Sequence, residues 1–519
     1  MRLTLSFALA LFALPLAAQT APEAPATDWH LQDPASGVPG IALDEAYRLL
    51  DGTTPREVVV AIIDSGVDAD HPDLAPVMWT NPGEVAGNGL DDDGNGYADD
   101  VHGWSFLGNA SGENVDVERL EIARLVAQCR AAAAPDPVCA DYEAALEAET
   151  AELRQAAANL YPVHAQMRGA DSLLAARFPD AYDPSGDVNA LDVGADVEAQ
   201  TAQRMLAFLA MQGASYADLD GYVTYIRKNL DYRLNPDYDP RPLVGDDLAD
   251  LTERDYGNAD SEGPDPSHGT GVAGLVAAVR GNGVGIDGIA PNGDAGGPVR
   301  IMALRAVPDG DEYDKDIANA IYYAVDNGAH IINMSFGKAY SPQKSIVDEA
   351  AQYAAARGVL LVHAAGNDGK DLAGGMNFPT DATLTGDLVP TWLEVGASAA
   401  DPDALAATFS NYGQAEVDLF APGAQVTSLA PDGETQVANG TSFAAPVVAG
   451  VAALVMAHFP DLTAPEVRQI LLDSVTPMAE TVTPRPGGEE AVAFGTLSAT
   501  GGLVNAAAAV RLAMERSAE

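Results

Sequence analysis

The sequence predicts an α/β protein of three layers, in which a mainly parallel sheet lies between helices, with a large helical insertion. Three observations predict this fold class. Short, nearly all-apolar, β-branched runs recur along the chain, as expected of parallel strands that are buried on both faces. Helical patterns lie between several of these runs, which is typical of a parallel sheet covered by helices. Between about residues 108 and 260 the strand pattern disappears and helical periodicity replaces it.

The N-terminus has the pattern of a secretory signal peptide. One basic residue precedes an apolar run that ends in the small residues Ala17 and Ala18. We therefore expect residues 1–18 to be cleaved, with an uncleaved membrane anchor as the alternative. The run is short for a membrane span, and no other stretch has the length and apolar character of one. The mature protein is expected to be secreted or periplasmic, without a membrane span.

The following segments should build the fold in chain order. Residues 19–52 are expected to form a linker and an N-terminal extension with a helix over 42–52. The main domain is predicted to occupy 53–515, interrupted by the insertion at about 108–260. Glycine ends each of two predicted helices, and Ser341 is expected to cap the second. The predicted strands are 57–66, 300–307, 330–336, 358–366 and 391–397, and the two helices are 315–328 and 341–358.

The insertion carries apolar residues at helical spacing, such as Ala202, Met205 and Leu206, which predicts one buried helix face. Its cysteines, Cys129 and Cys139, flank a Pro-Asp-Pro turn. In an exported chain a local disulfide that pins a helical hairpin is the simplest expectation. We hypothesise that the insertion lies along the rim of a cleft, where it could restrict access, select substrates or assist folding.

The charge of the chain excludes two classes of partner. Acidic residues number 76 against 27 basic ones, and the formal net charge is −49. Such a field repels nucleic acids and anionic membrane surfaces, so neither is expected to bind.

Four polar residues stand where strands end or helices begin. They are Asp64 in AIIDSGVD, His268 in DPSHGTGVAG, Asn367 in HAAGND and Ser442 in NGTSFAAP. A serine hydroxyl becomes a good nucleophile when a histidine takes its proton, and a buried aspartate orients that histidine. A helix N-terminus at Ser442 and the Asn367 amide could both donate to a developing oxyanion. Singly, each residue could be a helix cap or a turn residue; together they favour a catalytic site.

These four motifs, in this order, resemble those of the subtilisin-like serine peptidases (the subtilase family), and the resemblance covers residues 57–107 and 262–515. It implies a serine endopeptidase that hydrolyses proteins or peptides through an acyl-enzyme on Ser442. It implies that Asp64 orients His268, the general base and acid, and that Asn367 completes the oxyanion hole with the Ser442 backbone N–H. It also implies a substrate-binding backbone and a wall of the side-chain pocket, formed by Ser335, Phe336, Gly337 and by Ala364, Ala365, Gly366.

Two alternatives keep the same fold. One is a processing protease of narrow specificity, and the other is a catalytically silent binding protein, against which the intact motifs count. A lipase or esterase is disfavoured, because its G-x-S-x-G serine would come first among the catalytic residues. We expect a monomer.

An acidic loop over residues 87–104 predicts a structural Ca²⁺ site. Alternating oxygen ligands around a glycine turn suit this ion, which takes six to eight hard oxygens. The glutamate of an EF-hand loop is absent and His102 stands in its place, so we expect a calcium loop of another kind. A solvated acidic turn is the alternative. The candidate ligands are Asp91, Asp93, Asn95, Asp99 and Asp100.

Overall fold

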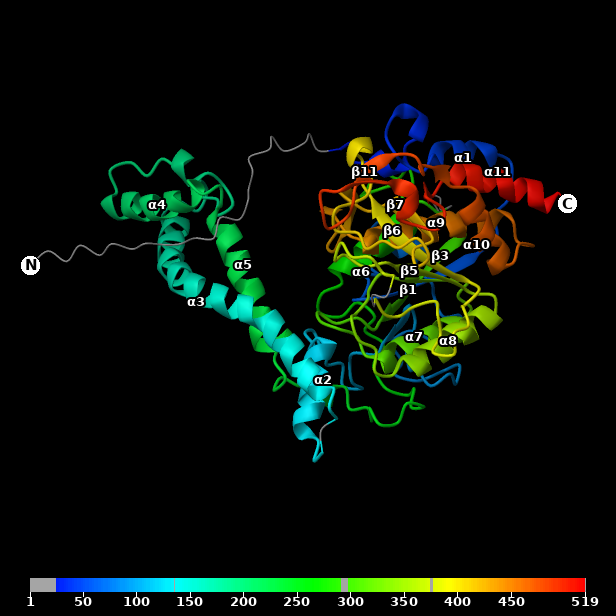
Figure 1. The fold of residues 1–519 in the computed structure, drawn as a ribbon, viewed down its shortest axis with the longest axis horizontal. Helices are drawn as coiled ribbons and strands as arrows, with labels where there is room; N and C mark the ends of the chain where they lie inside the picture. The colour runs from blue at the N-terminus through cyan, green and yellow to red at the C-terminus, as the bar shows by residue number, and fades with distance from the viewer. Residues whose placement is uncertain (1–24, 135, 291–296, 374–376, 519) are drawn as a thin grey trace, which may run out of the picture.

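The computed structural model describes residues 25–134, 136–290, 297–373 and 377–518. The expected signal peptide, residues 1–18, lies outside the described residues, as does the first part of the linker. A body of sheet and helices contains both the first and the last helix, and a helical arm that includes α3, α4 and α5 extends from it (Figure 1).

Within the described residues, nine strands form the central sheet, in the order β10-β13-β7-β6-β5-β4-β1-β3-β2. Every neighbouring pair is parallel except β10 with β13, so the predicted mainly parallel sheet is confirmed. Each predicted strand run overlaps one of these strands, although β3 begins one residue before its run and β6 ends one residue after its run. The strands are β1 (Val58–Asp64), β2 (Gly103–Ser105), β3 (Val299–Arg305), β4 (Ile331–Met334), β5 (Leu360–Ala364), β6 (Trp392–Ser398), β7 (Leu419–Pro422), β10 (Thr476–Pro477) and β13 (Gly502–Leu503); β8 (Val426–Ala430) pairs with β9 (Glu434–Ala438), and β11 (Val482–Pro484) with β12 (Ala491–Ala493).

The two faces of the sheet pack against different helices. Successive side chains of a strand point to opposite faces, and all seven residues of β1 are buried. Val60 joins the core cluster that contains α6 and α9, whereas Ala61 joins the cluster that contains α7 and α8. This gives the predicted three layers. The helices of the body are α1 (Leu43–Leu49), α6 (Ser267–Ala277), α7 (Asp314–Asp326), α8 (Lys344–Ala356), α9 (Thr441–His458), α10 (Ala464–Asp473) and α11 (Ala506–Ser517).

Helix α9 runs through the core and carries the predicted nucleophile near its start. Among the described residues it is the one helix long and apolar enough to cross a membrane, but 94% of that segment is buried within the protein. It is therefore a core helix, and its apolar character is explained by packing against the sheet.

The structure shows where the two predicted helices α7 and α8 begin and end. Gly328 and Gly358 follow α7 and α8 with positive φ angles of 84° and 76°, as expected of glycine after a helix. The predicted Ser341 cap is wrong, because α8 begins at Lys344 and the Ser341 hydroxyl donates instead to Asp314 at 2.9 Å.

The arm is helical and has two hydrophobic clusters of its own, one at its base and one in its outer half. The predicted disulfide is present and joins α2 to α3, with a Cα–Cα distance of 5.7 Å between Cys129 and Cys139. Ala202 and Leu206 are buried as predicted, but Met205 is 38% exposed, because helix packing covers only part of α4. The arm helices are α2 (Glu121–Ala131), α3 (Cys139–Arg177), α4 (Val197–Ala210) and α5 (Tyr216–Lys228).

Candidate active site

Asp64 and His268 meet at the carboxyl edge of the sheet. Asp64 is the last residue of β1, and His268 is the second residue of α6. The Asp64 carboxylate lies 2.6 Å from Nδ1 of His268 and is buried, while 39% of the histidine side chain is exposed. The hydrogen bond on Nδ1 leaves Nε2 as the nitrogen that can exchange a proton with a reacting group.

The environment of His268 raises its pKa above the ordinary value. Desolvation of the ring lowers the pKa, but the negative charge of Asp64 and its hydrogen bond raise it by more. The arrangement therefore favours the protonated ring, which is the state that a general base reaches after it accepts a proton.

Ser442 is the second residue of α9, not its cap as the sequence suggested, because Gly440 occupies the N-cap position. A Cβ atom on Gly440 would lie 2.6 Å from Oγ of Ser442, so only glycine leaves room for this hydroxyl. The N–H of Phe443 donates to the Gly440 carbonyl. The Ser442 N–H has no acceptor among the described residues and stays available at the positive end of the helix.

Asn367 is held beside this helix start. Its Oδ1 accepts hydrogen bonds from the backbone N–H of Thr441, at 2.8 Å, and from the Thr441 hydroxyl, at 3.1 Å. The same carboxamide therefore presents Nδ2 on its other side, which would lie 3.5 Å from a Cβ atom on Gly440. Asn367 Nδ2 and the Ser442 hydroxyl thus lie around the same glycine.

The described residues form no hydrogen bond between the His268 ring and the Ser442 hydroxyl. Their elements are nevertheless adjacent, because the His268 ring centroid lies 5.3 Å from that of Phe443, the residue after Ser442. Hydrogen bonds of this kind are often long or open before a substrate binds.

The predicted substrate-binding segment contacts the backbone of Ser442. The Ser335 hydroxyl donates to the Ser442 carbonyl at 2.7 Å and accepts from Asn333 at 2.8 Å. Ser335 is buried, Phe336 is partly buried and Gly337 is exposed at the protein surface. This exposed backbone follows β4, next to the start of α9.

Asn377, which the sequence did not indicate, lies between the two predicted pocket walls. Its Nδ2 donates to the Ala364 carbonyl at 2.9 Å. A Cβ atom on Gly337 would lie 2.3 Å from Asn377 Oδ1, and one on Gly366 would lie 3.2 Å from the same side chain. Ala365 packs into a separate core cluster, so its side chain does not take part.

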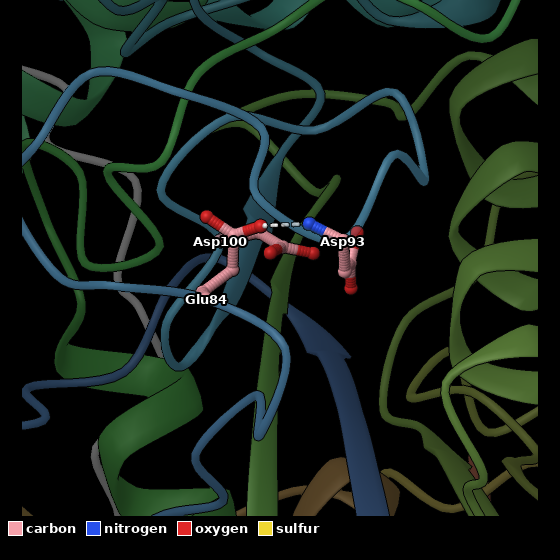
Figure 2. Close-up of side chains that lie close together, drawn as sticks. All are labelled: Glu84, Asp93 and Asp100. Carbon is pink, nitrogen blue, oxygen red and sulfur yellow. Dashed lines mark hydrogen bonds between the residues drawn. The ribbon is translucent and has the colours of Figure 1, made fainter.

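The acidic loop brings together Asp93 and Asp100 with Glu84, a residue that the sequence did not indicate (Figure 2). Ligand atoms of these three carboxylates lie within 4.8 Å of one another. The backbone N–H of Asp93 donates to Glu84 at 3.3 Å. Asn95 lies beside the cluster, since its Nδ2 donates to Asp100 at 3.0 Å.

Two other predicted ligands of this loop are engaged elsewhere. The Asp91 carboxylate accepts from the N–H groups of Gly94, Asn95 and Gly96. The Asp99 carboxylate accepts from the N–H groups of Asn88 and Gly89. These bonds shape the loop around the cluster rather than adding carboxylates to it.

The carboxylate cluster suits a hard cation. Burial raises the pKa of Asp100; hydrogen bonds from Tyr323 and Asn95 oppose this shift, and the charge of Asp93 adds to it. A divalent cation would offset the repulsion among the carboxylates, and oxygen donors are the ligands that Ca²⁺ takes. The donor set therefore fits calcium.

The fold and the site define an α/β protein with a hydrogen-bonded Asp64–His268 pair at the carboxyl edge of its sheet and a helix start that bears Ser442. The Subtilase family model matches residues 55–495, and the chain belongs to this family.

The curated relatives agree with this assignment. Alkaline elastase YaB of Bacillus sp. is 38% identical over 244 residues, which cover 47% of this chain and 55% of that protein. Subtilisin Savinase of Lederbergia lenta is 36% identical over 215 residues, covering 41% of this chain and 72% of that protein. The chain spans about half the length of the first curated relatives that it matches. A solved structure of proteases from Pseudoalteromonas arctica is similar with 21% identity and a TM-score of 0.47, covering 94% of this chain and 97% of that one.

Proposed function

We propose that this chain is a secreted or periplasmic serine endopeptidase that hydrolyses peptide bonds in proteins or peptides, as a monomer. The observation that carries the proposal is the 2.6 Å hydrogen bond between Asp64 and His268, next to a helix start that bears Ser442. Membership of the subtilase family supports the same reaction.

Acylation begins when Ser442 Oγ attacks the carbonyl carbon of the scissile bond and His268 Nε2 takes the hydroxyl proton. Asp64 keeps the ring oriented and stabilises the imidazolium that forms. His268 then gives the proton to the leaving amine, and the acyl group remains on Ser442. Water repeats the sequence, with His268 as its base, and releases the acid product.

The oxyanion of each tetrahedral intermediate would accept hydrogen bonds from the Ser442 N–H and from Asn367 Nδ2. The bonds from Thr441 to Asn367 Oδ1 fix the carboxamide in the orientation that this requires. Donors that are placed before the reaction stabilise the developing charge without reorganisation.

The proposed pocket would take a small substrate side chain before the cleaved bond, because Asn377 lies against both of its walls. A small pocket also favours a processing protease of narrow specificity over a protease of broad specificity.

A Ca²⁺ ion is proposed at Glu84, Asp93 and Asp100, with Asn95 beside it. The loop of these residues is held to α7 through Tyr323, whose hydroxyl donates to Asp100. When bound, the ion would neutralise the cluster and stabilise the loop, with no part in the reaction at Ser442.

Labelling with a fluorophosphonate probe tests the activity. The purified protein should be labelled at Ser442, as mapped by mass spectrometry, and Ser442→Ala should abolish the adduct. His268→Ala should slow labelling strongly while the protein stays folded. A folded, calcium-loaded protein that is neither labelled nor able to cleave a mixed peptide library would instead be a silent binding protein.

A further inference from the structure

Helix α2 at the base of the arm is tied to the catalytic body by buried charged groups. The chain that leads into it pairs with the segment after β3: Val117 forms a parallel bridge with Asp309, and the Arg119 carbonyl accepts from the N–H of Asp311 at 3.4 Å. The first N–H of α2, that of Glu121, then donates to the Asp311 carboxylate at 2.7 Å. The chain that enters the arm therefore lies alongside this segment, joined to it by a single parallel bridge.

Arg124 of α2 holds the main chain of this segment. Its guanidinium donates to the carbonyls of Asp311, at 2.7 Å, and Glu312, at 2.9 Å. It also lies 4.0 Å above the ring of Tyr313. Three successive residues of the body are thus bound by one side chain of the arm, and that side chain is only 3% exposed.

Glu121 extends the same network to the substrate-binding segment. Its carboxylate pairs with Arg124 and, at 2.9 Å, with Nζ of Lys338, the residue that directly follows Gly337. Lys338 Nζ also donates to the Glu312 carbonyl at 2.7 Å and pairs with Asp314 at 2.9 Å. The backbone of Lys338 exchanges two hydrogen bonds with Phe378, the neighbour of the pocket residue Asn377.

Such a buried network fixes geometry more than it adds stability. Removing charges from water is costly, and the remaining partners of a broken network stay unpaired. Three of these bonds, two from Arg124 and one from Lys338, end on carbonyls of the main chain. It is the main chain that an extended substrate would pair with.

We infer that α2 is a brace for substrate binding, and that Glu121 and Arg124 are positioning residues that hold the segments 309–313 and 335–338 in register with Ser442. The inference rests on the proposed function. The brace acts on the binding of an extended peptide and leaves the chemistry at Ser442 unchanged, because neither residue contacts Asp64, His268 or Asn367.

Arg124→Met tests the brace, since it removes the bonds to both carbonyls and keeps an apolar stem of similar length. Its KM for an extended peptide should rise about tenfold with kcat nearly unchanged, while the rate of labelling by a small fluorophosphonate stays that of the parent chain. Arg124→Lys should recover part of the loss. The matched control is Arg154→Met, which removes an exposed arm arginine paired with Glu147 and should change nothing.

Hydrogen exchange separates failure of the brace from failure of the proposed function. In Arg124→Met, amides of 309–313 and 335–338 should exchange faster whether or not the parent chain is active, while those of α9 keep their protection. Glu121→Gln, which keeps shape and one acceptor, supplies a second variant should Arg124→Met fail to fold. Unchanged exchange in these segments, or equal loss on extended and small substrates, would overturn the inference.

Discussion

The pocket between the two substrate-binding walls should become larger when Asn377 is shortened. Asn377→Ala removes three heavy atoms, Cγ, Oδ1 and Nδ2, from the space between Gly337 and Gly366. This is room for about two methylene groups of a substrate side chain, each of which contributes about 0.8 kcal/mol when buried. The free energy gained, about 1.6 kcal/mol, corresponds to a rate ratio of about 15.

The assay compares two peptides that differ only in the residue before the cleaved bond, alanine in one and methionine in the other. The ratio of their kcat/KM values, methionine over alanine, should rise about 15-fold in Asn377→Ala. The lost bond to the Ala364 carbonyl costs stability of about 1 kcal/mol but affects both peptides alike, so it cancels in the ratio.

Asn189→Ala makes the same chemical change on the exposed surface of the arm and should leave the ratio unchanged. A folded Asn377→Ala protein whose ratio stays within twofold of the parent would refute the assignment of Asn377 to the pocket.

Three further predictions concern pH, metal and the disulfide. A general base must be neutral to accept a proton, so kcat/KM should fall as the pH falls through the raised pKa of His268. Asp64→Asn removes the charge that raises this pKa, so the acidic side of the pH profile of kcat/KM should move to lower pH. A profile that does not move would contradict the pairing of Asp64 with His268. Removal of Ca²⁺ by a chelator should lower the melting temperature, and Asp93→Ala or Glu84→Gln should abolish most of this decrease. An equal melting temperature with and without the metal would contradict the calcium proposal. The double variant Cys129→Ser, Cys139→Ser should destabilise the base of the arm by about 3 kcal/mol, as measured by denaturant unfolding. Labelling of Ser442 should persist in this variant. Loss of labelling in the folded variant would show that the disulfide affects the active site itself.

The sequence predicted those elements whose structure depends on a local pattern of residues. A buried parallel strand needs only a short apolar run, so β1, β3, β4, β5 and β6 could be predicted. Asp64 and His268 are 204 positions apart, yet each could be placed at the end or start of its own element. Because parallel strands end at the same edge of a sheet, Asp64 and His268 could then be expected to lie close together.

Residues whose role depends on contacts between distant segments could not be predicted in this way. Asn377 has no periodicity or motif, and it lies beside the proposed pocket only because the segments after β4 and β5 come close to it. Glu84 precedes the acidic loop and enters the carboxylate cluster through the fold of that loop. Lys338 and Glu121 are 217 positions apart and meet only once the arm is in place.

The architecture of the arm explains how so large an insertion can leave the site intact. It leaves and rejoins the body through one neck, where Ser105 and Asn258 exchange backbone hydrogen bonds of 2.9 and 3.0 Å. The entropic cost of closing a loop grows only slowly with its length, and the outer half of the arm has a hydrophobic cluster of its own. The outer half can therefore vary without moving Asp64 or His268, because β1, α6 and α9 are continuous through the body. A change in α2 is different, since Arg124 binds the main chain of Asp311 and Glu312, and Glu121 pairs with the side chain of Lys338 beside the proposed substrate-binding segment.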